Sequence, residues 1–206
     1  MAEPPLVEGE VAAELAQEWP GLRLASMRFG FAPGPSPREL RDQLRLLSDR
    51  FRGPQAIALR RQPIPQAYRI FFRHIGLEPD ERRIPVEALV LERMQHGGFR
   101  SRNLLDDAIT IAVMETSVPV WALDAAAVGA GLRLRAAEAG EDVRAGRLVV
   151  AGEERPLVVL FDHPGPGAGV TGRTTEIVLF SVAVPGVPPI HVEEALWTVW
   201  DLVAGD

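Results

Sequence analysis

The stretches Leu104-Leu-Asp-Asp-Ala-Ile-Thr-Ile-Ala-Val-Met-Glu-Thr116 and Pro119-Val-Trp-Ala-Leu-Asp124 mark the point where the pattern of this chain changes. The first predicts a helix that ends before Pro119. After Pro119 the chain breaks into short β-rich runs separated by Gly, Asp and Glu clusters. These runs are 120–123, 132–136, 147–150, 157–161 and 177–184. Helices followed by a series of strands predict an α+β fold and argue against alternating βαβ units.

Upstream of this point the chain is mostly helical. Residues 7–18 predict a short amphipathic helix, and Leu22–Phe31 alternates as a strand does. Ser36 then predicts an N-cap for a helix that runs to about residue 52 and ends at Gly53-Pro54. Further helices are expected over 65–75, 85–96 and, at the end of the chain, 190–203.

Composition excludes several classes of protein. The chain has 206 residues and no Cys, so it has neither disulfides nor a thiolate nucleophile. All 22 basic residues are Arg, which removes lysine chemistry such as Schiff-base formation. The longest uncharged apolar runs, 109–114 and 157–161, are far shorter than the ~18 residues of a membrane span. With an acidic N-terminus as well, we expect a cytoplasmic protein without a membrane partner.

The charge of the chain is uneven. Residues 36–102 hold 14 Arg and 8 acidic residues, a net charge of +6, whereas residues 103–206 carry −9. A basic segment in an acidic protein is typical of a surface that faces nucleic acid, and the RNA-binding candidates are Arg60, Arg61, Arg100 and Arg102. Helix faces that carry many ion pairs would give the same charge count.

Most motifs in the sequence point away from specific chemistry. Gly167–Thr174 approaches a phosphate loop, but Arg173 replaces the lysine and a strand follows instead of a helix. The four histidines lack zinc-ligand spacing, so no metal is expected. The adjacent acids Asp106 and Asp107 are interpreted as solvated surface. Asp162-His163 follows an apolar strand at the start of a Gly/Pro loop, where either a site or a capped turn is expected.

Several fragments in order resemble the B3/B4 domain of the phenylalanyl-tRNA synthetase β subunit, which also occurs in free-standing proteins. The helical part contributes Ala67-Tyr-Arg, Gly76-Leu77 with Pro79, Pro85-Val-Glu87-Ala-Leu89 and Asn103-Leu-Leu-Asp-Asp107. The second half contributes Pro119–Asp124, Leu132–Ala136 with Gly140-Glu141, Asp162-His163, Gly169–Thr174 and Val178–Phe180. The resemblance runs from about residue 69 to residue 180.

This resemblance implies a B3/B4-like α+β fold, with a helical first half packed on a mostly antiparallel sheet and a C-terminal helix. It implies one domain over 1–206, made of an N-terminal helix and strand (1–35), a helical part (36–118) and a sheet part with a closing helix (119–206). In the synthetase this domain removes tyrosine that has been mis-attached to the phenylalanine tRNA. The expected partners are therefore tRNA or aminoacyl-tRNA and an amino-acid-like ligand, with no DNA and no cofactor.

The sequence departs from the family pattern within the implied site. Trp121 stands where the editing synthetases place a histidine, Thr110 where Asn is common, and Arg173 where an acid is common. The loop from Asp162 to Val170 is also shorter than in the synthetases. We therefore expect hydrolysis of mis-acylated tRNA in trans to be weak or altered. There are two alternatives to this function. The chain could be a ligand-binding module without catalysis, or a purely structural protein on the same scaffold.

The resemblance and the residue chemistry together give a set of candidate site residues. The catalytic candidates are Asp162, His163 and Thr174. The substrate-binding candidates are Thr110, Trp121, Asp124, Arg133 and Arg135. The sequence leaves one alternative open for each of these. Trp121 is equally compatible with a packed core position, and Arg133 and Arg135 with a solvent-facing row.

Overall fold

Proline sets the start of three long helices. The computed structural model describes residues 3–51 and 53–205, and within this part are eight helices: α1 (Ala13–Glu18), α2 (Arg38–Arg50), α3 (Gly53–Leu59), α4 (Pro63–His74), α5 (Pro85–His96), α6 (Leu104–Thr116), α7 (Ala125–Val128) and α8 (Pro189–Ala204). Proline lies in the first turn of α4, α5 and α8, where its missing N–H costs no helix hydrogen bond. α5 ends at Gly97, whose φ of 74° is the left-handed conformation that glycine adopts readily.

The strands form one curled sheet that brings both ends of the chain together. Its seven strands within the described residues are β1 (Leu6–Val11), β2 (Arg23–Gly30), β3 (Trp121–Asp124), β4 (Arg133–Ala136), β5 (Leu148–Ala151), β6 (Pro156–Val159) and β7 (Glu176–Ala183). Their order is β3-β7-β2-β1-β4-β5-β6. Neighbours pair antiparallel except β1 and β4, which are parallel.

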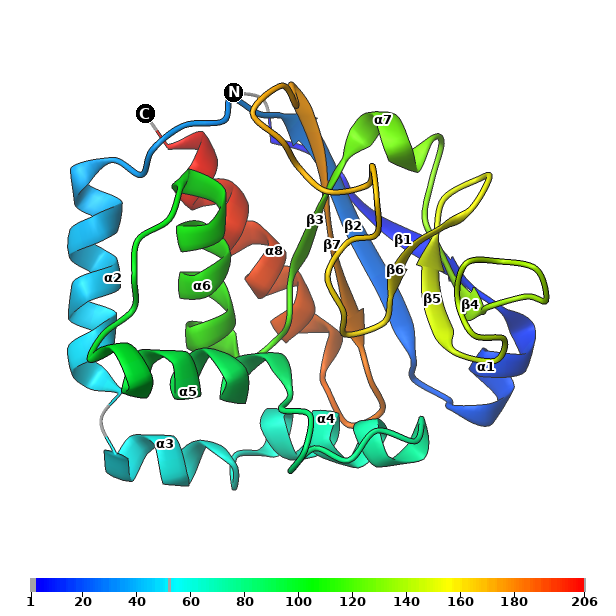
Figure 1. Cartoon of the computed structure of the whole chain (residues 1–206), viewed down its shortest axis with the longest axis horizontal. Helices are drawn as coiled ribbons and strands as arrows, with labels where there is room; N and C mark the ends of the chain where they lie inside the picture. Colours follow the sequence, from blue (N-terminus) through cyan, green and yellow to red (C-terminus); the bar gives the residue numbers. More distant parts are fainter. Residues whose placement is uncertain (1–2, 52, 206) are drawn as a thin grey trace.

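Most of the helices lie against one part of the sheet. Figure 1 shows α6 and α8 beside β3, β7 and β2, with α2 outside them and α3, α4 and α5 at one end. The core includes the fully buried rings of Tyr68, Phe71, Phe72 and Phe180. The predicted α+β class, mostly antiparallel sheet and C-terminal helix are confirmed. No helix among residues 3–51 and 53–205 is long and apolar enough to cross a membrane.

The prediction of a helix over residues 7–18 is wrong in its first half. Strand β1 occupies Leu6–Val11, and only Ala13–Glu18 is helical. β1 pairs with β2 on one side and β4 on the other, and these long-range partners override the local pattern. Gly9 permits the close packing, because a Cβ there would lie 2.7 Å from Leu24 Cδ2.

Three further local predictions are corrected, at α2, α3 and α6. Gly53-Pro54, which is predicted only to end the preceding helix, also begins a new helix, α3. Pro37 is the N-cap residue of α2, and the Ser36 hydroxyl donates instead to Asp107 Oδ2 at 2.5 Å. Asp107 is therefore not solvated: it is 1% exposed and also accepts hydrogen bonds from the Ser101 hydroxyl and the Arg102 N–H.

Candidate functional site

A cleft of about 790 Å³ lies between helices α5 and α6 and the loop of residues 161–170. We call it the Trp121 cleft. The polar residues along it are Arg82, Arg83, Glu92, Arg102, Asp106, Thr110, Asp162 and His163. Four of the sequence-predicted site residues and one predicted RNA-binding arginine, Arg102, thus lie around one cavity whose size suits a small ligand.

Trp121 forms the aromatic wall of this cleft. β3 pairs antiparallel with β7 so that Trp121 lies opposite Phe180, and the two rings stack with centroids 5.3 Å apart and an interplanar angle of 12°. The indole Nε1–H donates to the backbone oxygen of Asp162 at 3.0 Å. The indole is therefore fixed on both sides, and its N–H is not free to contact a ligand.

Phe161 places the loop after β6 against the helical layer. It is 8% exposed and has a φ of 68°, a conformation that costs energy for a residue with a large side chain. Its ring contacts Phe72 at 4.5 Å and Tyr68 at 6.1 Å between centroids. Burial raises the pKa of the Tyr68 hydroxyl, which stays neutral and donates to Val182 O at 2.8 Å. This packing holds the strained residue that leads directly into Asp162-His163.

Asp162 and His163 lie at the rim with different partners. Arg82 Nη2 lies 2.8 Å from Asp162 Oδ1 and also donates to the backbone oxygen of Phe161 at 3.3 Å. Asp162 Oδ2 receives no hydrogen bond from the described residues. His163 is exposed and has no polar partner in the described part of the chain. The rim thus offers one free carboxylate oxygen and one free imidazole.

Two residues of the loop 161–170 that line the cleft have backbone N–H groups without a partner in the described part of the chain. Within this loop the Gly165 N–H donates to Leu157 O at 2.7 Å and the Ala168 N–H donates to Gly165 O. The N–H groups of Gly169 and Val170 donate to none of the described residues, and both residues line the cleft. Successive unpaired amides are suited to bind a carbonyl oxygen or an anion.

Asp124 and Thr174 are brought together, but not along the Trp121 cleft. The Thr174 hydroxyl donates to Asp124 Oδ2 at 2.6 Å, and Asp124 Oδ1 caps α7 by accepting from the Ala126 N–H. Thr174 is 2% exposed and also accepts from the Thr171 N–H. These contacts fix the turn of residues 171–174 against the end of β3. Thr110 does line the cleft, although its hydroxyl donates to Asp106 O at 2.7 Å.

Arg133 and Arg135 line a different groove, of about 940 Å³, on the part of the sheet around β1 and β4. Arg133 pairs with Glu10 at 2.6 Å. Arg135 binds both carboxylate oxygens of Glu141, at 2.5 and 3.0 Å, and this hydrogen bonding lowers the pKa of Glu141. Neither arginine borders the Trp121 cleft.

The predicted RNA-binding arginines are spread over the surface. Arg102 lines the Trp121 cleft and pairs with Glu92 at 2.5 Å. Arg61 and Arg100 are exposed. Arg60 borders a separate apolar pocket and lies 3.5 Å from the carboxylates of Asp80 and Glu87. Of the four, only Arg102 borders the cleft.

About half of the chain is similar to a segment of known tRNA ligase subunits. The chain is similar to the phenylalanine--tRNA ligase beta subunits of Pseudomonas savastanoi pv. phaseolicola, with 31% identity over 107 residues, and of Pseudoalteromonas translucida, with 28% over 102 residues. The matches cover 47% and 45% of this chain. They span only 14% and 13% of the relatives' length. No family model matches the chain.

Two residues that shape the cleft were missed by sequence reasoning. Arg82, which holds Asp162, lies 80 positions away in the chain, and nothing in the sequence links the two. The sequence predicts a strand that ends at Phe161, but nothing in the local sequence signals a positive φ at this residue. The pair Arg82-Arg83, just before the proline that starts α5, is the one signal that could have drawn attention to this region.

Proposed function

We propose that this chain acts in trans on mis-acylated tRNA and that the Trp121 cleft receives the aminoacyl group. The observation that carries the proposal is the similarity to the beta subunits of a tRNA ligase. The cleft supports it, because an aromatic wall, two free amides and an exposed imidazole surround one cavity. A cytoplasmic location and the absence of a cofactor belong to the same proposal.

The reaction proposed is hydrolysis of the ester that joins the amino acid to the terminal ribose. His163 accepts a proton from a water molecule, whose oxygen attacks the ester carbonyl carbon. The Gly169 and Val170 N–H groups stabilise the negative charge that develops on the carbonyl oxygen. The carbon–oxygen bond to the ribose then breaks, the proton passes to the ribose oxygen, and the free amino acid and tRNA leave.

The other groups of the cleft would bind the substrate. Asp162 Oδ2 is available to accept a hydrogen bond from the substrate's α-ammonium, while Arg82 holds the other oxygen. Trp121 and Thr110 border the space for the side chain, and Arg102 lies where it can meet a phosphate. Thr174 and Asp124 act indirectly in this proposal, as positioning residues for the loop.

We propose that hydrolysis is slow. Trp121 offers no proton donor to the substrate, since its N–H is held by the Asp162 backbone. His163 is exposed to water and is not oriented by a second group among the described residues, which lowers its efficiency as a base. Replacing Trp121 by His would restore a polar side chain but would also remove the stack on Phe180 and the contact to the loop. We expect Trp121→His to recover little activity.

The test is a deacylation panel in which the purified protein meets tRNAs mis-charged with different amino acids. Hydrolysis above the protein-free rate for at least one pair supports the proposal, and His163→Ala should abolish most of it. His74→Ala is the matched control, because His74 is also exposed but lines a separate pocket. No hydrolysis of any pair would contradict the catalytic part, as would equal loss in both variants.

A second candidate function is binding of an amino-acid-like ligand without catalysis. The observation that favours it is that polar groups at the cleft already have partners within the protein. Asp162 is paired with Arg82, and the Trp121 N–H donates to the Asp162 backbone oxygen. Titration with free amino acids, followed by the Trp121 indole N–H resonance, tests this function. Saturable movement of that resonance together with no deacylation would favour the binding module.

A further inference from the structure

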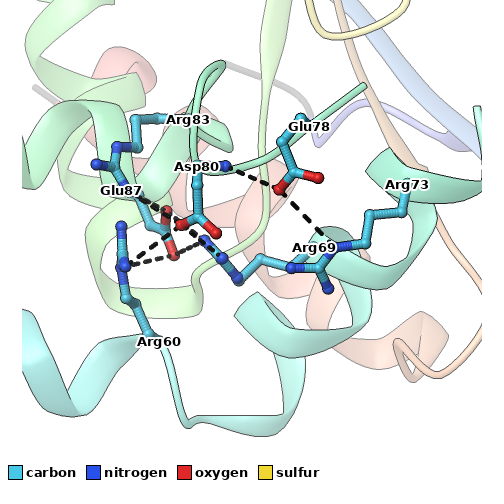
Figure 2. Close-up of polar contacts among 7 residues, drawn as sticks. All are labelled: Arg60, Arg69, Arg73, Glu78, Asp80, Arg83 and Glu87. Atoms are coloured by element: carbon cyan, nitrogen blue, oxygen red, sulfur yellow. Dashed lines mark hydrogen bonds and ion pairs between the residues drawn. The ribbon is translucent and has the colours of Figure 1, made fainter. Parts of the chain in front are cut away.

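A network of charged residues lies where the end of α3, helix α4, the loop before α5 and the start of α5 meet (Figure 2). Arg69 lies at its centre: its guanidinium donates to both oxygens of Glu87 at 3.0 Å and to Asp80 Oδ1 at 2.9 Å. Arg69 and Glu87 are buried, so a paired and hydrogen-bonded arrangement is required there. Arg69 thus donates hydrogen bonds to the carboxylates of both Glu87 and Asp80.

Arg60 and Arg83 lie beside Arg69, Asp80 and Glu87, but their guanidinium groups form no hydrogen bonds with these residues. Arg60 lies 3.5 Å from Asp80 and Glu87, and Arg83 lies 3.5 and 3.9 Å from the same carboxylates. Neither guanidinium donates a hydrogen bond to any residue within 3–51 or 53–205, and Arg83 Nη1 is buried without a hydrogen-bond partner. The side chains of Arg60 and Arg83 are nevertheless 42% and 33% exposed, so they can meet an external acceptor.

The charge balance of the network favours a single added negative charge. Figure 2 draws four arginines and three acidic residues, the remaining pair being Arg73 and Glu78. The network therefore carries one positive charge more than its acids neutralise. One monoanion bound between Arg60 and Arg83 would balance it and would use guanidinium donors that are now free.

An apolar pocket lies directly beside these two arginines. It has a volume of about 340 Å³, lies between α3 and α5, and is bordered by both Arg60 and Arg83. Leu59 and Val90 are buried there, whereas Ile57 is 68% and Met94 52% exposed. Large apolar side chains that stay exposed around a hollow are typical of a surface that binds an apolar group.

We propose that this pocket binds an amphipathic monocarboxylate, an apolar chain with one terminal carboxylate. The carboxylate lies between Arg60 and Arg83, and the chain covers Ile57 and Met94. The site is separate from the Trp121 cleft and independent of the function proposed for it, although Arg83 borders both. Charge complementarity selects the head group, and the apolar walls select the tail.

Octanoate is the probe for the test, and the methyl group of Met94 is the reporter. The full chain is labelled with ¹³C-methyl methionine, which gives signals from Met1, Met27, Met94 and Met114. Met94→Leu assigns the Met94 signal. We expect octanoate to move that signal saturably and to leave the buried Met27 and Met114 unmoved. Octylamine, with the same tail and the opposite charge, and acetate, with the head group alone, should each bind at least about tenfold more weakly.

Arg60→Gln tests the head-group contact in the same experiment. It leaves the Arg69–Glu87 pair in place, so the fold is expected to survive, and circular dichroism checks this. We expect octanoate binding to weaken at least about tenfold, whereas the exposed-arginine control Arg45→Gln leaves it unchanged. Equal binding of octanoate and octylamine, equal binding of acetate and octanoate, no movement of the Met94 signal, or an unaffected Arg60→Gln variant would each overturn the proposal.

Discussion

The indole N–H of Trp121 donates to the backbone oxygen of Asp162 at 3.0 Å, and this contact joins edge strand β3 to the loop after β6. The two residues are 41 positions apart in the chain. This hydrogen bond positions Asp162 and His163 at the rim of the cleft. It also occupies the indole N–H of Trp121, the polar group of the aromatic wall. The same bond therefore shapes the cleft and limits the chemistry available in it.

Trp121→Phe should lower the free energy of unfolding by about 1–2 kcal/mol, because the hydrogen bond and part of the stacking area are lost. Trp200→Phe is the matched control, since the buried Nε1 of Trp200 has no hydrogen-bond partner among the residues that the structure describes. We expect a smaller cost there. Urea denaturation of both variants measures the difference, and an equal or larger loss in Trp200→Phe would contradict the role given to the Trp121 bond.

Asp107→Asn should cost about 2–3 kcal/mol of stability. The Asp107 carboxylate is 1% exposed and accepts from Ser36, Ser101 and the Arg102 N–H, and an amide group cannot accept all three. Asp106→Asn, which changes the neighbouring and more exposed acid, should cost less than about 1 kcal/mol. Thermal unfolding compares the two variants. Similar losses would show that Asp107 has no special structural role.

Glu141 predicts a pH-dependent part of the stability. The hydrogen bond from Arg135 lowers the pKa of Glu141, so the folded state favours the ionised carboxylate. Its contribution is fully present above the ordinary glutamate pKa of about 4.3 and is lost as the pH falls through the lower folded-state pKa. Wild type should therefore exceed Glu141→Gln in stability at pH 7 and approach it below about pH 4. A difference that grows on acidification would have the wrong sign.

Binding of tRNA should weaken steeply with salt, because phosphate contacts release counterions. The net charge of −6 predicts weak binding that is best seen at low salt. Arg102→Gln should reduce affinity, since Arg102 borders the cleft, whereas Arg45→Gln on α2 should not. Filter binding between about 50 and 200 mM salt measures both effects. A flat salt dependence would favour a small-molecule ligand.

The helical part of the fold could be predicted because its signals are local. Proline at the start of α4, α5 and α8 and glycine after α5 are local signals of helix ends. Strand β1 escaped prediction because its state depends on β2 and β4, which are distant in sequence. The sequence does not predict the start of α3, because Gly-Pro can end one helix and also begin another.

The candidate site was predictable only in part for the same reason. Trp121, Asp162 and His163 belong to short motifs that could be recognised in the chain, and they border one cleft. The pairing of Asp162 with Arg82 depends on tertiary packing alone. The prediction that Asp107 is solvated is wrong, because a pair of adjacent acids is typical of a surface. The donors that bury its carboxylate come from distant as well as neighbouring residues.

The central claim is that the Trp121 cleft holds the aminoacyl end of a tRNA, and indole N–H spectroscopy tests it without requiring catalysis. The chain has four tryptophans, Trp19, Trp121, Trp197 and Trp200, so a ¹⁵N-tryptophan-labelled sample gives four indole signals. The probe is a tRNA whose amino acid is attached by a non-hydrolysable amide. We predict that it moves the Trp121 signal saturably and that the same tRNA without an amino acid moves it far less. An unmoved Trp121 signal, or an equal response to both tRNAs, would contradict the claim.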